Sequence, residues 1–427
     1  MLKDVGKFLT SHWDGHRPLL LGYSGGPDSK ALLYALLEAG CKKLHLAHVD
    51  HAWRPESERE ASELRQEAKS LGLPFHTIRL TLPPNANKEA ASREARLAFF
   101  RSLFEAYPFQ ALLLAHHAAD AAETALKRVL EGAHLPFLGG MEPIGHLHGM
   151  NIWRPLFSVA KEEISAFLEF KNLKPLIDPT NSDPAYLRAR MRSEILPSLA
   201  RLFGKEISDN LLLLSQRAAE LKAYLETKTA IHAPRRGPWG LFGHVGNLER
   251  MEARYLLQKW MDIEKIRLPR TLLEAALNAT RSNLPNRWIS PRIFVDRGHV
   301  FFLSIAQPSW GTGTLRLQPG SWRWGDWTIE VREGEGPVFQ EREIGWKDVW
   351  SGRFTVQAPQ GWLSMPTAGM RLRHLWNERK VPAFFRYRVP IVLNESGGAA
   401  EFLTGKNLHG IGSHFILVIS SHSMPTS

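Results

Sequence analysis

The first 200 residues alternate short apolar runs, typical of strands, with longer amphipathic runs, typical of helices. The strand-like runs are 18–23, 43–49, 75–80 and 110–115, and the helical runs are 29–39, 56–71, 88–105 and 118–131. This order predicts an α/β fold with a doubly wound, mostly parallel sheet that helices cover on both faces. Such sheets bind ligands beyond the carboxyl ends of their strands. We therefore expect residues 24–29, 48–51 and 116–120 to lie on one rim.

The first strand-like run ends at a loop of small, polar residues, namely Ser24, Gly25, Gly26, Pro27, Asp28 and Ser29. Glycines let a phosphate chain approach backbone N–H groups closely, and the N-terminus of the following helix favours anions. Asp28 repels phosphate by itself, so we expect it to hold a magnesium ion or a loop amide. An ordinary turn with a helix cap is the alternative. The spacing matches neither the Walker A loop nor G-x-G-x-x-G.

The chain has 427 residues and carries 54 Lys and Arg against 43 Asp and Glu, a net charge of +11. The basic balance favours a polyanionic partner such as nucleic acid, although a basic protein without such a partner is the alternative. The single cysteine, Cys41, excludes a structural disulfide or a thiolate metal site held by this chain alone. No apolar run approaches the ~20 residues of a membrane span, so we expect a cytoplasmic protein without membrane contact.

The sequence pattern changes after residue 200. Further helical runs are 205–226, 249–263 and 270–280, and a Pro- and Gly-rich stretch at 232–246 reads as a loop. From about residue 287 the chain consists of short aromatic and β-branched runs with turns, and a helix is expected at about 369–380. We expect three domains: a PP-loop-type nucleotide-binding domain at 1–204, a mainly helical middle domain at 205–320, and a small α+β domain at 321–427.

Residues Ser24 to Ser29 read SGGPDS, and His48-Val49-Asp50-His51 is followed by Trp53-Arg54. These motifs resemble the PP-loop of ATP pyrophosphatases and the HVDHGLR motif of the tRNA(Ile)-lysidine synthetase family within them. Other matching stretches are Asn87–Phe100, 112–124, 139–141, Arg154–Leu156, Asp178–Asn181, Arg188 with Arg192, and 372–393. The resemblance is dense over 19–200, weak over 205–310 and patchy afterwards.

The resemblance implies an enzyme that uses ATP and Mg²⁺ to modify the wobble cytidine of an isoleucine tRNA with a CAU anticodon. ATP would adenylate the O2 of that cytosine and release pyrophosphate. The amine of free lysine would then attack C2 and expel AMP, which gives lysidine. The sequence is compatible with a homodimer.

The resemblance also assigns site residues. The expected catalytic residues are Asp28, His117, Asp120, Glu123 and Arg192, and the expected magnesium ligands are Asp28 and Asp120. The expected ATP-binding residues are Ser24, Gly25, Gly26, Pro27, Asp28, Ser29, His48, Asp50, His51 and Arg93. Asp120 and Glu123 are one helical turn apart, so one could bind metal, or both could hold the lysine ammonium, or both could face solvent. A zinc site of His48, His51, His116 and His117 is a further alternative.

Four positions depart from the family pattern. Ala119 and Ala121 replace an Asp and a Gln, Glu131 replaces an Arg, and Ala189 replaces an Asn. They indicate either a variant with compensating residues, Arg128 among them, or reduced activity or a changed substrate. The rival hypotheses are therefore another PP-loop tRNA-modifying enzyme and a catalytically impaired tRNA-binding relative.

The segment 371–388 combines basic and aromatic residues. Basic side chains grip phosphates, and aromatic rings stack on exposed bases. Aromatic residues are more often found in cores, so the other interpretation is a small domain core with a charged rim. We expect the aromatic rings mainly inside and the basic residues outside, in a domain that binds tRNA.

Overall fold

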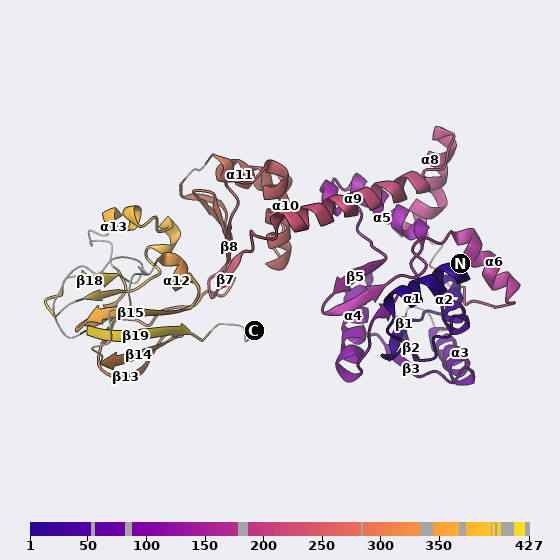
Figure 1. Cartoon of the computed structure of the whole chain (residues 1–427), viewed down its shortest axis with the longest axis horizontal. Coiled ribbons are helices and arrows are strands. Elements are labelled where there is room, and N and C mark those ends of the chain that lie inside the picture. The colour runs from indigo at the N-terminus through magenta and orange to yellow at the C-terminus, as the bar shows by residue number, and fades with distance from the viewer. Residues whose placement is uncertain are drawn as a thin grey trace. The chain divides into compact units, whose positions relative to one another are not determined.

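The computed structural model describes residues 1–52, 56–81, 88–177, 187–282, 285–333, 345–366, 373–393, 395–397, 399–402 and 414–422 (Figure 1). The motif residues Trp53, Arg54, Asn87, Asp178, Pro179, Thr180 and Asn181 lie outside the described residues. The chain divides into two compact units, Met1–Tyr224 and Leu225–Ser427, and the division falls within helix α9 (Ser208–Thr229). Among the described helices, none is long and apolar enough to cross a membrane.

The first unit is built on a six-stranded sheet with the order β3-β2-β1-β4-β6-β5. Its strands are β1 (Leu19–Gly22), β2 (Leu44–Asp50), β3 (Phe75–Arg79), β4 (Leu112–Leu113), β5 (Ile144–Leu147) and β6 (Met150–Trp153). All neighbouring pairs are parallel except β5 with β6, which form an antiparallel hairpin at one edge. The mostly parallel sheet is therefore confirmed, and the hairpin is an addition to it.

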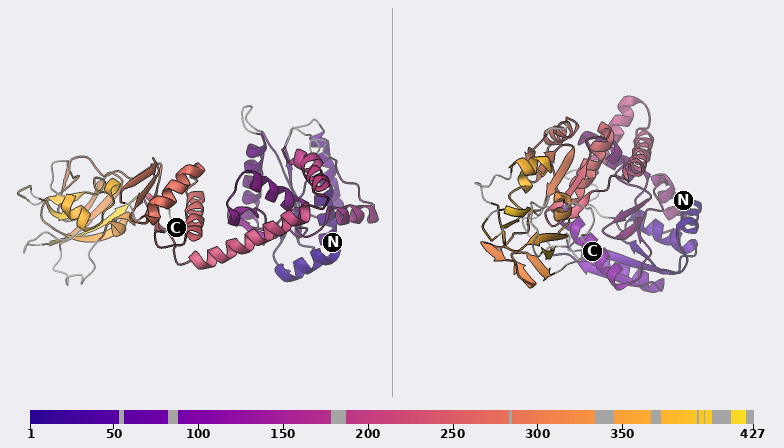
Figure 2. Two further views of the ribbon diagram at one scale, coloured as in Figure 1. Left: turned by 90° about the horizontal axis from the view of Figure 1, so that it is seen from above. Right: turned by 60° about the vertical axis from the view of Figure 1, so that its left-hand side comes forward.

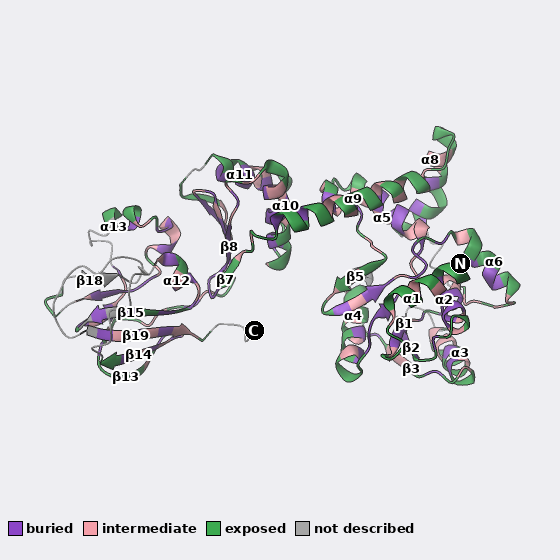
Figure 3. Ribbon diagram, in the orientation of Figure 1, coloured by how far each residue is buried: buried purple, intermediate pink, exposed green. Residues whose placement is uncertain are grey.

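Helices cover both faces of this sheet (Figures 1 and 2). The described α-helices that lie wholly within the unit are α1 (Leu2–His12), α2 (Pro27–Glu38), α3 (Ser57–Ser70), α4 (Lys88–Ala106), α5 (Ala118–Leu130), α6 (Lys161–Phe170), α7 (Leu187–Arg190) and α8 (Leu196–Phe203). Successive residues of a strand point to opposite faces. Leu19 and Leu21 accordingly pack with α1, α2, α3 and α6, whereas Leu20 packs with Phe100 and Leu103 of α4. The central strands β1, β2, β4 and β6 are mostly buried between these layers, whereas the edge strands β3 and β5 are not (Figure 3).

The second unit begins its sheet structure in the segment that the sequence analysis interprets as a loop. A five-stranded antiparallel sheet has the order β7-β8-β11-β10-β9. Its strands are β7 (Arg235–Gly237), β8 (Gly240–His244), β9 (Arg287–Ser290), β10 (Ile293–Asp296) and β11 (His299–Leu303), and helices α10 (Arg250–Ile263) and α11 (Arg270–Arg281) lie between β8 and β9 in the chain. The loop interpretation of 232–246 is therefore wrong, and the segment predicted as mainly helical also holds a sheet.

The glycines of this stretch allow close packing within strands. The sequence analysis interprets them as signs of a loop, which is why it misses the strands. A Cβ at Gly237 would overlap the backbone oxygen of Trp350, and a Cβ at Gly240 would overlap that of Phe302. Gly240 also has φ +131°, a backbone conformation that other residues rarely adopt. Both glycines thus mark strands that another part of the backbone approaches closely.

Two four-stranded antiparallel sheets complete the second unit, with the orders β12-β16-β17-β18 and β13-β14-β19-β15. Their strands are β12 (Thr314–Arg316), β13 (Gly320–Trp324), β14 (Trp327–Glu333), β15 (Arg353–Pro359), β16 (Trp362–Ser364), β17 (Ile391–Leu393), β18 (Ala399–Phe402) and β19 (His414–Ser421). The short helices are α12 (Trp346–Trp350) and α13 (Arg373–Glu378), and α13 lies within the helix expected at about 369–380.

One tryptophan-rich core runs through the second unit. Trp239, in the turn between β7 and β8, and Phe242 of β8 belong to the same buried cluster as Trp327 and Trp350. This core crosses residue 320, where the sequence analysis expects a domain boundary. The division into three domains, 1–204, 205–320 and 321–427, therefore stays a prediction.

The aromatic residues of the basic segment divide between the core and the surface. Trp376 and Phe385 are buried in the tryptophan-rich core, whereas the Tyr387 residue is 46% exposed. Arg373 and Lys380 are exposed. Arg379, Arg386 and Arg388 are half-buried, so the expectation of basic groups outside holds only in part.

Candidate active site

The loop between β1 and α2 has a backbone that requires glycine. Gly25 has φ +77°, and a Cβ there would come within 2.6 Å of Leu64 Cδ2 and 2.8 Å of Leu176 Cδ1. The Leu176 N–H donates to the Gly25 carbonyl oxygen at 2.9 Å, which fixes the loop against a segment 150 residues further along the chain. Contacts with Leu64 and Leu176 therefore hold the backbone of the loop in one conformation.

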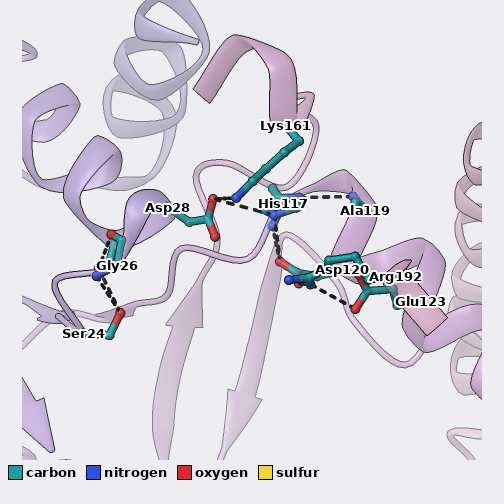
Figure 4. Close-up of polar contacts among 10 residues, drawn as sticks. Ser24, Gly26, Asp28, His117, Ala119, Asp120, Glu123, Lys161 and Arg192 are labelled. Atoms are coloured by element: carbon teal, nitrogen blue, oxygen red, sulfur yellow. Dashed lines mark hydrogen bonds and ion pairs between the residues drawn. The ribbon is translucent and has the colours of Figure 1, made fainter. Parts of the chain in front are cut away.

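The hydroxyls of Ser24 and Ser29 hold the start of α2, and Figure 4 shows the contact of Ser24 with Gly26. Gly26 is the N-cap residue of α2, and its N–H donates to Ser24 Oγ at 3.3 Å. Ser29 Oγ donates to the Gly26 carbonyl oxygen and lies 3.1 Å from Ser24 Oγ. The loop thus brings hydroxyl groups, backbone N–H groups and the positive end of the α2 dipole to one point. These are the donors that a polyphosphate needs.

Asp28 lies in the first turn of α2 and forms an ion pair with Lys161 at the start of α6. The ring of His117 approaches the same Asp28 oxygen, with Nε2 3.8 Å from Asp28 Oδ1 and 3.6 Å from Asp120 Oδ2. Figure 4 shows the three side chains Asp28, His117 and Lys161 pointing toward one another from α2, α5 and α6. The structure therefore brings together Asp28, His117 and Asp120, as the sequence analysis expects for the strand rim.

His117 and Asp120 form a capping box at the start of α5. The Ala119 N–H donates to His117 Nδ1 at 3.3 Å, and the His117 N–H donates to Asp120 Oδ2 at 3.0 Å. Because Nδ1 accepts a hydrogen bond, the ring hydrogen of neutral His117 sits on Nε2. The His117 residue is 1% exposed, and within the described residues its Nε2 makes no hydrogen bond.

Asp120 and Glu123 face the same side and share Arg192. Arg192 Nε donates to Glu123 Oε1 at 2.7 Å, and its Nη2 donates to Glu123 Oε2 and Asp120 Oδ1, each at 3.1 Å. The Glu123 side chain is only 4% exposed, so it does not face solvent. Burial lowers the pKa of Arg192, but the hydrogen bond to Glu123 and the two nearby carboxylates outweigh it, and the pKa is raised.

Arginines gather beside this group. Arg154 Nε donates to His116 Nδ1 at 3.2 Å, and Arg154 Nη1 donates to the Glu142 carbonyl oxygen at 2.7 Å. Burial, and then the charges of Arg154 and two further arginines, lowers the pKa of His116 to about 4 although Asp120 opposes this. Desolvation by surrounding atoms and the charges of Arg93 and Arg188 likewise lower the pKa of Arg96. His116 is therefore neutral at physiological pH, in a region of positive charge.

The HVDH motif lies at the end of β2. The ring of His48 is buried, with Nδ1 3.0 Å from the Tyr23 carbonyl oxygen, and burial lowers its pKa. Asp50 accepts the Ala52 N–H at 2.8 Å and lies 3.7 Å from Arg79 Nε. A pocket of about 250 Å³ next to it is lined by Asp50, Glu58, Ser62, Arg65, Thr77 and Arg79. The assignment of His48, Asp50, His51 and Arg93 to ATP stays a prediction.

The side chains of the site can be compared with the ligands that zinc and magnesium require. In the described part of the chain, no group of three or more His, Cys, Asp or Glu side chains is placed to hold a metal ion, so the zinc alternative gains no support. Magnesium is usually bound by one or two carboxylates together with substrate phosphates and water. Asp28, at a phosphate-type loop, fits this role. Asp120 already has partners on both oxygens, Arg192 and the His117 N–H, so its role as a magnesium ligand stays a prediction.

Sequence reasoning missed three residues that support the loop. The sequence offered one indication of a role for Lys161, its position a few residues after the Arg154–Leu156 motif. Lys30 and Glu67 form an ion pair of 3.0 Å behind the loop, and the Tyr23 hydroxyl donates to Glu67 at 2.6 Å. A buried lysine within the apolar face of α2 is the signal that could have pointed to this network.

A known protein family matches most of the first unit, and a relative matches nearly the whole chain. A family model described as a PP-loop domain matches residues 2–199. The tRNA(Ile)-lysidine synthase of Protochlamydia amoebophila is 32% identical over 430 residues, which cover 95% of this chain and 93% of that protein. The tRNA(Ile)-lysidine synthase of Chlamydia felis is 42% identical over 220 residues, which cover 51% of this chain and 68% of that protein.

Among solved structures, a U34-tRNA thiolase of Methanococcus maripaludis aligns with a TM-score of 0.42 and 19% identity, over 51% of this chain and 77% of that chain. The similarity to the Protochlamydia protein, by contrast, extends through both units. The chain thus belongs to the tRNA(Ile)-lysidine synthase family.

Proposed function

We propose that this chain ligates lysine to C2 of the wobble cytidine of an isoleucine tRNA with a CAU anticodon, and that it converts ATP to AMP and pyrophosphate. The observation that carries the proposal is the phosphate-type loop with Asp28 at its helix, in a chain whose family resemblance covers 95% of its length. A cytoplasmic location, free lysine as co-substrate and a homodimeric state are parts of the same proposal.

In the first step, the cytosine O2 attacks the α-phosphorus of ATP and the bond to the bridging oxygen of pyrophosphate breaks. The loop N–H groups, the hydroxyls of Ser24 and Ser29 and the α2 N-terminus would hold the phosphates. Bound magnesium would neutralise phosphate charge, and Asp28 is the side chain placed to hold it. Reactions of this kind depend mainly on positioning and charge neutralisation, which this arrangement supplies.

In the second step, the lysine amine attacks C2, a proton leaves the nitrogen, and AMP departs. Asp120 and Glu123 carry the negative charge that would hold an ammonium group of lysine. Arg192 occupies both carboxylates here, so it would have to yield when lysine binds. His117 lies beside Asp28 and Asp120, and with its ring hydrogen on Nε2 it is our candidate for donating a proton to the departing AMP.

The decisive experiment measures incorporation of radiolabelled lysine into unmodified isoleucine tRNA with a CAU anticodon, with and without ATP. Elongator methionine tRNA, which has the same anticodon, serves as the substrate control. Incorporation that requires ATP is expected. Binding of the tRNA without incorporation would instead favour a catalytically impaired relative. A tRNA thiolase of the type that uses catalytic cysteines is disfavoured, because the chain has one cysteine.

A further inference from the structure

Helices α2 and α6 run side by side in the same direction and are joined by a lysine ion pair at each end. Lys161, the first residue of α6, pairs with Asp28 in the first turn of α2. Lys171, at the end of α6, pairs with Glu38, the last residue of α2. The two pairs look equivalent as ties between helices, but only the first lies at the phosphate-type loop.

The N-terminus of a third helix reaches the same point. His117 is the N-cap residue of α5, and its ring lies 3.8 Å from Asp28 Oδ1. Side chains from the N-terminal ends of α5 and α6, those of His117 and Lys161, therefore approach one carboxylate oxygen in the first turn of α2 (Figure 4). Helix N-termini carry partial positive charge and unpaired N–H groups. Asp120 in the first turn of α5 and Glu162 and Glu163 in that of α6 offset part of this charge, so it is the contacts of Lys161 and His117 that indicate a ligand here.

The ring of His117 provides an independent indication of a ligand. Its Nε2 carries a hydrogen, because Nδ1 accepts the Ala119 N–H, yet within the residues described it has no hydrogen-bond acceptor. The residue is 1% exposed, and a donor buried without a partner is costly. Nε2 points between Asp28 and Asp120, both beyond hydrogen-bond length. A phosphate oxygen held at the α2 N-terminus would be an acceptor for it.

We propose that Lys161 is a pyrophosphate-binding residue. In the free enzyme its ammonium group balances Asp28; when magnesium and nucleotide occupy the site, the ammonium moves to oxygens of the β- and γ-phosphates. As the α-phosphorus bond breaks, its electron pair passes to the bridging oxygen of pyrophosphate, and Lys161 offsets that charge. The Lys161 side chain is 39% exposed and has room to move. This inference rests on the proposed use of ATP by the loop.

The test compares Lys161→Met with Lys171→Met in the full-length protein, with inorganic pyrophosphate as the probe in calorimetric titrations with and without Mg²⁺. Lys171→Met is the matched control, because it removes the other ion pair between the same two helices. We expect Lys161→Met to weaken pyrophosphate binding by about 10- to 100-fold, in the range of a lost charged contact. We expect Lys171→Met to change it less than about 2-fold, and Lys161→Arg to retain most of the affinity.

Equal losses in both Met variants would mean that Lys161 is only a tie between helices. Unchanged or tighter pyrophosphate binding by Lys161→Met, or no pyrophosphate binding by the unchanged protein, would also overturn the proposal. Thermal unfolding of each variant checks the fold, and Lys161→Gln replaces the Met variant if that one fails to fold. Lysine incorporation is measured separately. Pyrophosphate binding that depends on Lys161, without lysine incorporation, would refute the proposed function and leave this inference standing.

Discussion

Arg192 binds Glu123 with two parallel N–H donors, Nε to Oε1 and Nη2 to Oε2, and the same Nη2 also reaches Asp120. Bidentate pairs of this kind are stronger and more specific than single contacts. Glu123 is almost fully buried, so it depends on this partner. The pair therefore joins α5 to the π-helical turn Met191–Ile195 at the candidate site.

Replacing Arg192 with Met leaves the Glu123 carboxylate buried without its partner. We expect the first unit to lose about 1–3 kcal/mol of unfolding free energy, less than for a fully buried pair because Arg192 is half-exposed. Urea unfolding measures the change. Arg201→Met, an exposed arginine on α8, is the control and should change the free energy by less than about 0.5 kcal/mol.

Replacing Asp28 with Ala removes the carboxylate at the start of α2 but touches little of the core. AMP formation should fall by about 100- to 1000-fold or more, the range seen when a key electrostatic group is removed from an active site. Affinity for tRNA should stay nearly unchanged. The measurement is AMP release with tRNA and lysine present, beside a tRNA binding assay. An equal loss in both assays would contradict the role assigned to Asp28.

The predicted contact of the second unit with tRNA is better tested by single charge substitutions than by deletion. Removing residues 321–427 would expose Trp239 and Phe242, because the core crosses that boundary. Arg373→Gln and Lys380→Gln alter exposed basic groups instead. Each should reduce the slope of log affinity against log salt by about 1 if it contacts a phosphate. Arg59→Gln, on exposed α3, should leave the slope unchanged.

Stability should decrease as the pH falls from about 6.5 to about 4. Burial and neighbouring positive charges lower the pKa of His116 in the first unit and of His299 in the second to about 4. In that pH range the unfolded chain binds protons that the folded chain does not, so acid favours unfolding. Chemical unfolding at several pH values measures the slope. His116→Gln and His299→Gln should each flatten it, and an unaltered slope in both would count against this origin.

The thiol of Cys41 should be inert in the folded protein. It is fully buried, and burial raises its pKa to about 12. The thiolate is the reactive form, so a thiol reagent at pH 8 should label the folded chain far more slowly than the chain in urea. Fast labelling of the native protein would show that the end of α2 opens easily.

The strand rim was predictable because it follows from local signals. Alternating strand and helix periods gave the sheet, and the carboxyl-end rule brought Asp28, His117 and Asp120 together. The capping box of His117 was hidden, because histidine is not a common N-cap residue. The contact of Lys161 with Asp28 depends on where α6 packs, and no local pattern contains that information. The strands around Gly240 were missed for the same reason, since their close neighbours lie more than 60 residues away.

Because of the tryptophan-rich core, tryptophan, the main source of intrinsic fluorescence, is distributed unevenly between the two units. Of the 14 tryptophans, Trp13, Trp53 and Trp153 precede residue 225, and the remaining 11 belong to the second unit. Intrinsic fluorescence will therefore report mainly on the second unit, whereas Cys41 labelling reports on the first. The two signals, followed in one sample, can reveal whether the nucleotide-binding half and the tryptophan-rich half melt together or one after the other.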